Sequence, residues 1–170
     1  MTTLNLKMKK TADDVFTPSF ATKYSACFDI HAYLKTGTTV DVWSDSGRKL
    51  VKKLVRDNRY LLYPNERVLI PTGLIMDIPP LHSVRLHSRS GLAFKSGVVL
   101  GNGEGIIDCD YVEPVFILLH NTTDANSIIV DGDRIAQGEL VHQLHYSITE
   151  IAISPQPKSA RSGGFGSTGK

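Results

Sequence analysis

The chain has 170 residues, of which 41% are hydrophobic and 21% are charged, and its 19 basic and 17 acidic residues leave a net charge of +2. A chain of this length can bury a core of its own as one domain, without disulfides or metal staples. The nearly balanced charge excludes a polybasic nucleic-acid coat and a disordered polyelectrolyte, and we expect no direct nucleic-acid binding.

The sequence indicates neither a membrane span nor a metal site with cysteine ligands. No segment approaches the roughly 20 apolar residues of a membrane span, so we expect no membrane association and a protein of the cytoplasm, or of the host cytoplasm for a viral source. Cys27 and Cys109 are the only cysteines, and neither lies in a Cys-x-x-Cys pair. Their spacing predicts no metal site with sulfur ligands. The histidines, at positions 31, 82, 87, 120, 142 and 145, show no ligand spacing either and are interpreted as structural or surface residues.

Short apolar runs bounded by Gly, Pro, Asn and Asp recur along the chain, beginning with the alternation of Leu4, Leu6 and Met8 with polar residues. This period of two predicts β-strands. Many short strands favour an all-β fold, a jelly-roll-like distorted β-barrel, over a β-α-β layout. The later runs that we interpret as strands are 67–70, 73–78, 83–87, 98–100, 115–120, 127–130, 134–137 and 140–151.

The segment 36–63 is ambiguous. Leu50, Val51 and Leu54 have the spacing of one helical face, yet Asp45-Ser46-Gly47 resembles a turn between β-prone runs. We favour a surface insertion of two or three strands over a helix. Such an insertion should be dispensable for the chemistry of the protein, and it is a possible docking surface for a protein partner.

The composition shifts to Ser, Pro, Lys and Gly from Pro155 onward. We therefore divide the chain into a β domain of residues 1–154 and a flexible glycine-rich tail of residues 155–170. The end of the tail fits most of a Walker A phosphate loop, but it lacks the preceding strand and the following Ser or Thr that such a loop needs. Its glycine amides can still approach a phosphate, and Phe165 suits stacking on a base.

Two further segments suggest chemistry. Asp108 and Asp110 lie two residues apart and hence on one face of an extended segment, which suits metal binding or general-base work; the alternative is an Asp-rich turn packed by Tyr111. Arg89 and Ser90 resemble an anion cradle, with a guanidinium for bidentate phosphate contact and a hydroxyl as donor, although a surface loop has the same appearance.

Five segments taken together, in order and spacing, resemble the five motifs of the homotrimeric dUTP diphosphatases, or dUTPases. They are 26–32, 88–93, 97–111, 132–137 and 163–169. The resemblance covers nearly the whole chain apart from 36–63. It implies a trimer whose active sites combine motifs of different subunits and close with the tail of a third. The implied reaction converts dUTP and water to dUMP and diphosphate with Mg²⁺, which limits uracil incorporation into DNA and supplies dUMP for thymidylate synthesis.

The resemblance also implies roles for single residues. Asp108 matches the aspartate that activates water, Tyr111 the residue that packs on deoxyribose, and Asp29 an acidic residue that reaches the metal through water. The other positions that match substrate-binding residues are Arg89, Ser90, Gly91, Asn102, Gly105, Ile107, Gln137, Arg161, Phe165, Gly166, Ser167 and Thr168.

Three departures from the family pattern stand out. The usual tail arginine is Ala160, with Arg161 one position closer to the phenylalanine; Ser88 replaces a proline; and 112–114 replaces a polar residue plus glycine. Two alternatives remain open. One is a dCTP deaminase or bifunctional deaminase–dUTPase, which shares the fold. The other is a dUTP-responsive regulatory protein that binds partners through 36–63.

Overall fold

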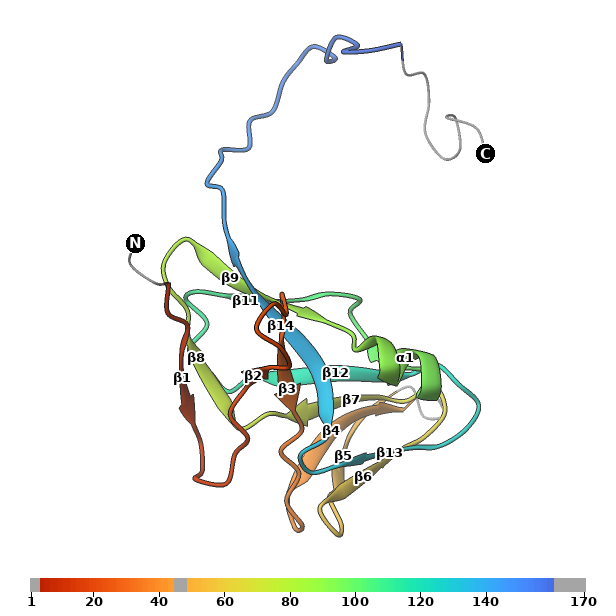
Figure 1. Cartoon of the computed structure of the whole chain (residues 1–170). Helices are drawn as coiled ribbons and strands as arrows, with labels where there is room; N and C mark the ends of the chain where they lie inside the picture. Colours follow the sequence, from red (N-terminus) through yellow and green to blue (C-terminus); the bar gives the residue numbers. More distant parts are fainter. Residues whose placement is uncertain (1–3, 45–48, 161–170) are drawn as a thin grey trace.

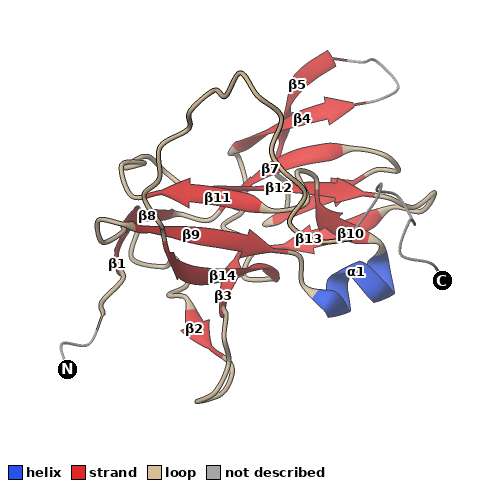
Figure 2. Cartoon of the chain, turned by 90° about the horizontal axis from the view of Figure 1, so that it is seen from above, coloured by secondary structure: helices blue, strands red, loops and turns tan. Residues whose placement is uncertain are grey.

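The computed structural model describes residues 4–44 and 49–160, which form an all-β fold with one short helix (Figures 1 and 2). The elements are β1 (Lys7–Lys10), β2 (Ser19–Phe20), β3 (Phe28–His31), β4 (Thr39–Ser44), β5 (Lys49–Leu54), β6 (Arg59–Leu62), β7 (Arg67–Pro71), β8 (Leu74–Asp77), β9 (His82–His87), α1 (Ser90–Ser96), β10 (Val98–Leu100), β11 (Gly105–Asp108), β12 (Phe116–Asn121), β13 (Ser127–Val130) and β14 (Arg134–His142). Two five-stranded sheets, ordered β10-β12-β7-β4-β5 and β11-β9-β14-β3-β2, are accompanied by the pairs β1-β8 and β13-β6.

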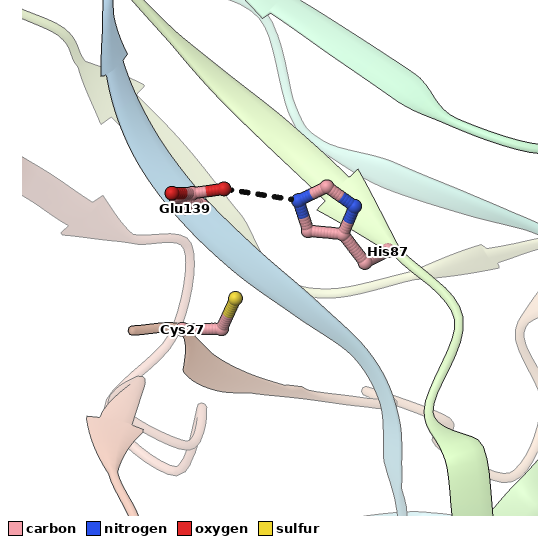
Figure 3. A group of neighbouring side chains, drawn as sticks. All are labelled: Cys27, His87 and Glu139. Atoms are coloured by element: carbon pink, nitrogen blue, oxygen red, sulfur yellow. Dashed lines mark ion pairs between the residues drawn. The ribbon is translucent and has the colours of Figure 1, made fainter. Parts of the chain in front are cut away.

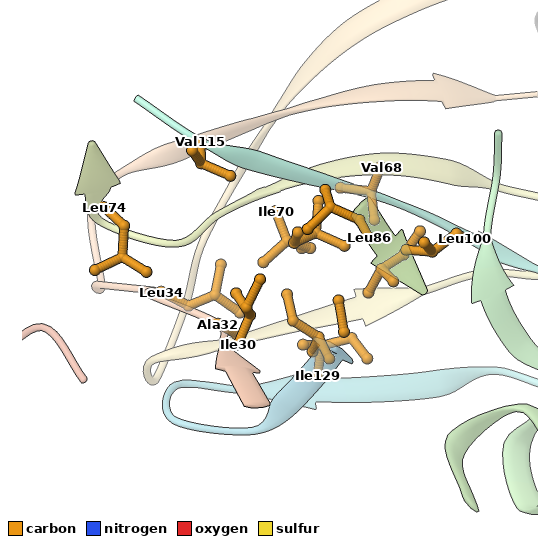
Figure 4. Packing of buried hydrophobic residues seen from close by; sticks show 14 of the residues in the cluster. Ile30, Ala32, Leu34, Val68, Ile70, Leu74, Leu86, Leu100, Val115 and Ile129 are labelled. Atoms are coloured by element: carbon orange, nitrogen blue, oxygen red, sulfur yellow. The ribbon is translucent and has the colours of Figure 1, made fainter. Parts of the chain in front are cut away.

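The core lies between the two large sheets. Val68 and Ile70 of β7 and Leu100 of β10 come from one sheet, and Ile30 of β3 and Leu86 of β9 come from the other (Figure 4). Burying the apolar face of each sheet against the other is what the alternating sequence pattern requires. The predicted all-β, jelly-roll-like fold is confirmed.

The last predicted strand is only partly correct. β14 ends at His142, and residues 143–160 contain no strand and extend away from the sheets (Figure 1). Leu144, Tyr146 and Ile148 are 80%, 81% and 91% exposed. Their alternation is typical of a strand, but a strand also needs a partner to pair with. Among the described residues of this chain, no strand pairs with them.

The segment 36–63 forms strands rather than a helix, as predicted, but the prediction that it is a surface insertion is wrong. β4 pairs with β7 inside a five-stranded sheet, and its Val40 and Val42 are buried in the core. β6 pairs with β13 and buries Tyr60 and Leu62. β5 is an edge strand of the large sheet, with Leu50 and Leu54 exposed. Replacing the whole segment by a turn would therefore remove core, and we no longer expect it to be dispensable.

Buried polar contacts also connect this segment to the rest of the fold. The Glu66 side chain is buried, and its Oε2 accepts a hydrogen bond of 2.9 Å from the Tyr60 hydroxyl and one of 3.2 Å from the Tyr63 amide. Lys53 of β5 forms an ion pair with the other carboxylate oxygen. Desolvation, followed by the hydrogen bond to Glu66, raises the pKa of Tyr60 far above its usual value. A buried carboxylate with several partners fixes the position of the strands around it.

Helix α1 occupies a segment that the sequence left as either an anion cradle or a loop. Arg89 is its N-cap, and Gly97 ends it in the left-handed conformation with φ +61°, where the Gly97 N–H donates to the Ala93 carbonyl. A Cβ at Gly97 would lie 2.1 Å from Cγ2 of Thr123, so only glycine fits this turn. Within 4–44 and 49–160, no helix is long and apolar enough to span a membrane.

Candidate active site

A buried carboxylate joins two arginines at one end of the sheet that contains β3, β9 and β14. Oδ1 of Asp29 accepts a 3.1 Å hydrogen bond from Nε of Arg89, and Oδ2 accepts one of 3.1 Å from Nη1 of Arg134. Nη1 of Arg89 also donates to the Arg134 carbonyl at 3.2 Å. The Asp29 side chain is only 6% exposed, whereas the Arg134 side chain is 51% exposed. Two guanidiniums and one carboxylate leave a net charge of +1, which suits an anion.

The surroundings of this cluster are also basic. A surface hollow beside α1 is lined by Arg89, Gly91, Lys95, Asp133 and Arg134, among other residues. Ser90 and Gly91, in the first turn of α1, are exposed next to Arg89. Three cations against one carboxylate in this lining favour phosphate oxygens as a ligand.

Strand pairing brings Gln137 to the same place. In the register of the sheet, Gln137 of β14 lies opposite Asp29 of β3 on one side and opposite His87 of β9 on the other. Arg89 follows His87 by two residues. The structure therefore gathers Asp29, Arg89 and Gln137, which come from three separate sequence motifs, at one end of this sheet.

Arg134 lies in the segment 132–137, for which the family resemblance implied a role only for Gln137. Its hydrogen bond to Asp29 places it in the same cluster as Arg89. The available signal was a basic residue three positions before Gln137. A basic residue in a segment that already held one expected phosphate contact, Gln137, would have justified including it.

The connection between β10 and β11 carries the residues expected to contact the uracil base. β10 belongs to one large sheet and β11 to the other, and they are joined by a turn in which the Gly103 N–H donates to the Leu100 carbonyl at 3.1 Å. Asn102 is exposed in this turn. Gly105 is buried, and a Cβ there would lie 2.8 Å from Cδ1 of Leu86, so the close approach of β11 to β9 requires glycine. The backbone of this turn is accessible to a ligand.

Ile107 and Asp108 point to opposite faces of β11. The Ile107 side chain is buried in the core, so only its backbone can contact a ligand. Asp108 is exposed at the end of the strand, and within the described ranges its carboxylate has no hydrogen bond or ion pair. The Tyr111 amide donates to the Asp108 carbonyl at 3.1 Å, and the Tyr111 hydroxyl donates to the Pro114 carbonyl at 3.0 Å. This turn leaves the Tyr111 ring 42% exposed.

The predicted catalytic and phosphate-binding residues do not meet within one chain. Asp108 lies opposite Ser83, near the start of β9, whereas Arg89 lies beyond the end of that strand. Six residues separate Ser83 from Arg89, and at about 3.3 Å per residue this corresponds to roughly 20 Å. The structure therefore divides the predicted site into an arginine end and an Asp108 end.

The predicted tail contacts Arg161, Phe165, Gly166, Ser167 and Thr168 lie outside the described residues. The described portion defines a class of protein: a two-sheet β protein with a preformed cluster of net positive charge and a separate exposed carboxylate.

Comparison with known proteins identifies the family within this class. The dUTPase family model matches residues 53–169. A deoxyuridine 5'-triphosphate nucleotidohydrolase of Brucella melitensis biotype 2 is 40% identical over 142 residues, which cover 83% of this chain and 85% of the relative. One from Rhizobium rhizogenes is 34% identical over 168 residues, which cover 98% of this chain and 94% of the relative. The chain belongs to the dUTPase family.

Solved structures agree on the fold. A mutant dUTPase of Staphylococcus bacteriophage 80alpha with dUpNHpp is similar with a TM-score of 0.72 and 20% identity, covering 98% of this chain and 99% of that one. A mutant dUTPase from phage phi11 of S. aureus, which coordinates a structural Mg(II) ion, has a TM-score of 0.68 and 18% identity, covering 89% and 99%.

Proposed function

We propose that this dUTPase family member hydrolyses dUTP to dUMP and diphosphate. The observation that carries the proposal is the Asp29–Arg89–Arg134 cluster beside Gln137, a preformed positive site at the position where the family motifs imply phosphate contacts. The relatives reported above have names that specify this activity, and none of these names indicates a deaminase or a regulatory protein. The physiological result would be less uracil in DNA and a supply of dUMP.

The proposed chemistry is water attack at the α-phosphorus. The Asp108 carboxylate accepts a proton from the water while the new O–P bond forms, and the bond from the α-phosphorus to the bridging oxygen breaks to release diphosphate. Arg89, Ser90 and Gln137 bind the phosphate oxygens and hold the chain of phosphates in line for the attack. Asp29 acts as a positioning residue, because its two oxygens orient Arg89 and Arg134.

We expect the connection between β10 and β11 to determine the choice of substrate. We expect backbone N–H and C=O groups of residues 102–107 to form hydrogen bonds with uracil. Cytosine carries an amino group where uracil has a carbonyl oxygen, so a backbone N–H that donates to uracil would have no acceptor in cytosine. The hydrogen bond from the Tyr111 hydroxyl to the Pro114 carbonyl fixes the position of the ring. We expect the ring to pack against the deoxyribose and to leave no space for a 2′-hydroxyl.

Mg²⁺ is the expected cofactor and would neutralise part of the triphosphate charge. The sequence predicts that Asp29 reaches this ion through water. Both Asp29 oxygens accept guanidinium hydrogen bonds in a cluster of net charge +1, so this arrangement suits phosphate oxygens and does not suit direct coordination of a cation. The contact through water stays a prediction.

We further propose that the active enzyme is a homotrimer with sites shared between subunits. The separation of roughly 20 Å between Asp108 and Arg89 supports this. A complete site would need Asp108 of one subunit to lie beside Arg89 of another. The exposed apolar side chains of residues 143–160 also support it, since such a segment needs a surface to cover it. A cytoplasmic location stays a prediction as well.

An assay against single nucleotides tests the proposed activity. With Mg²⁺, the purified protein should convert dUTP to dUMP and diphosphate and turn over dCTP, dTTP and UTP at least about 10³-fold more slowly. Ammonia release from dCTP would instead support the deaminase. Absence of dUMP formation from dUTP, in a protein whose circular dichroism shows a folded β protein, would contradict the proposal.

A further inference from the structure

Three side chains with metal-binding atoms meet beside the arginine cluster. The Sγ of Cys27, a ring nitrogen of His87 and a carboxylate oxygen of Glu139 lie within 4.8 Å of one another, and all three residues are half-buried (Figure 3). Nε2 of His87 and Oε2 of Glu139 are 3.4 Å apart. None of these residues has a part in the chemistry proposed above.

Two of the three residues lie in paired strands of one sheet, and the third directly precedes a strand of the same sheet. Cys27 directly precedes β3, His87 ends β9, and Glu139 lies in β14, the strand between the other two. The ladder of β14 with β9 holds the backbones of His87 and Glu139 in place, and the pairing of β14 with β3 begins at Phe28, the residue after Cys27. Such a rigid arrangement is what a metal site needs in order to fix its ligands.

The donor types, and the separation of two of the three ligand atoms, fit Zn²⁺. Zinc binds imidazole nitrogen and carboxylate oxygen at about 2.0 to 2.2 Å, so two such ligands at a tetrahedral angle are about 3.4 Å apart. The His87–Glu139 separation of 3.4 Å already has this value. A sulfur, a nitrogen and an oxygen donor suit zinc, whereas Mg²⁺ prefers oxygen ligands throughout. Three protein ligands leave the fourth zinc position for water.

A second carboxylate faces the other nitrogen of the imidazole. Oε1 of Glu104 lies 4.0 Å from Nδ1 of His87, and its Oε2 accepts a 3.1 Å hydrogen bond from Nη1 of Arg85. Histidines that bind zinc through one nitrogen usually donate the other N–H to a carboxylate, which fixes the ring orientation. At 4.0 Å, Glu104 is beyond hydrogen-bond distance of Nδ1, so it would have to move closer on metal binding to act as this outer partner. It is not one of the three proposed ligands.

We propose that Cys27, His87 and Glu139 form a Zn²⁺ site that ties β3, β9 and β14 together. Cys27 lies two residues before Asp29, His87 two residues before Arg89, and Glu139 two residues after Gln137. Bound zinc would thus restrain all three strands that hold the phosphate-side residues. Binding requires loss of the Cys27 thiol proton to solvent.

Cobalt provides a direct probe of the proposed ligands, because Co²⁺ occupies zinc sites and a thiolate ligand gives a charge-transfer band in the near ultraviolet. The experiment uses the full chain without a polyhistidine tag. We expect about one Co²⁺ per chain with this band, displacement of Co²⁺ by Zn²⁺ and not by Mg²⁺, and a melting temperature that rises with Zn²⁺ concentration.

Substitutions assign the site. Cys27→Ser should abolish the thiolate band and weaken Zn²⁺ binding by at least about 100-fold, and Glu139→Gln should weaken binding similarly while keeping the band at saturating Co²⁺. Glu104→Gln should weaken Zn²⁺ binding about 10-fold and keep the band, as expected of a positioning residue. Cys109→Ser is the matched control and should bind Zn²⁺ like the unchanged protein.

Two results would overturn the proposal. One is Zn²⁺ binding by the unchanged protein without a thiolate band, which would locate the metal elsewhere, for instance at the His82 and His142 rings, whose centroids are 5.1 Å apart. The other is equal Zn²⁺ affinity in Cys27→Ser and the unchanged protein. The metal-free melting temperature of each variant shows that it is folded, so loss of binding is distinguished from unfolding.

Discussion

The two ends of β9 differ in how many contacts hold their functional side chains within one chain. At the end near Arg89, each oxygen of the buried Asp29 carboxylate holds one arginine at 3.1 Å, and Gln137 lies in the adjoining register position. At the end near Ser83, the carboxylate of Asp108 is exposed and has no hydrogen bond or ion pair among residues 4–44 and 49–160.

This difference indicates separate functions for two aspartates of one sheet. A carboxylate that already accepts two guanidinium hydrogen bonds is suited to positioning its partners and contributes to stability. An exposed carboxylate without such partners contributes little to stability and is free to accept a proton. We therefore expect the Asp108 end to supply chemistry once another subunit supplies the phosphates.

The largest expected effect is that of Asp108→Asn. This change keeps the shape and removes the base, so single-turnover hydrolysis of dUTP should fall by about 10² to 10⁴-fold while binding of a non-hydrolysable dUTP analogue changes little. Asp110→Asn is the matched control and should have a much smaller effect. A nearly normal single-turnover rate in Asp108→Asn would remove this residue from the role of base.

Mixing two inactive variants tests whether the two ends come from different chains. Asp108→Asn and Arg89→Ala homotrimers should both be nearly inactive. In trimers assembled at random from equal amounts, a site shared between neighbouring subunits has both residues intact in about a quarter of cases, so about a quarter of the unchanged activity should return. Light scattering would verify the trimer. Continued inactivity of mixed trimers would refute a shared site.

Asp29→Asn should act mainly on stability, in contrast to the same change at Asp108. It weakens two charge-assisted hydrogen bonds to Arg89 and Arg134 and should lower the free energy of unfolding by about 2 kcal/mol, measured by urea denaturation. Asp41→Asn, which disrupts the exposed pair with Lys52, should cost less than about 1 kcal/mol. If Asp29→Asn were as stable as the unchanged protein, the arginine end would not be preformed by this carboxylate.

The smallest expected effect concerns pH at the arginine end. Burial lowers the pKa of His31 below 6.5; Asp29 opposes this shift, and Arg134 and Arg89 add to it. The unfolded state therefore binds the proton more readily, so stability should fall as pH drops below about 6.5. His31→Gln should reduce the difference in unfolding free energy between about pH 7.5 and about pH 5.5. An unchanged difference would show that other groups cause the pH dependence.

The strands and the contiguous motifs could be predicted from the sequence because they depend on local patterns. The runs 98–100 and 127–130 coincide with β10 and β13, since alternation of apolar residues and nearby turn residues specify a strand wherever it finally pairs. The prediction of strand ends and of strand burial failed where these depend on pairing with a distant strand. The pattern of 140–151 continues past His142 although strand pairing in the described part of the chain stops there, and 36–63 contains strands whose burial depends on β7 and β13.

The sequence by itself determined the all-β class, the family motifs and most of the expected site residues, because these are properties of neighbouring residues along the chain. Only the tertiary structure decided that Arg134 shares Asp29 with Arg89, that Asp108 and Arg89 occupy opposite ends of β9, and that Cys27, His87 and Glu139 meet. Spacing along the chain had predicted no sulfur-metal site. The physical reason is that antiparallel pairing of β3, β14 and β9 brings together residues that are far apart in sequence, and that register cannot be read from the spacing within any one motif.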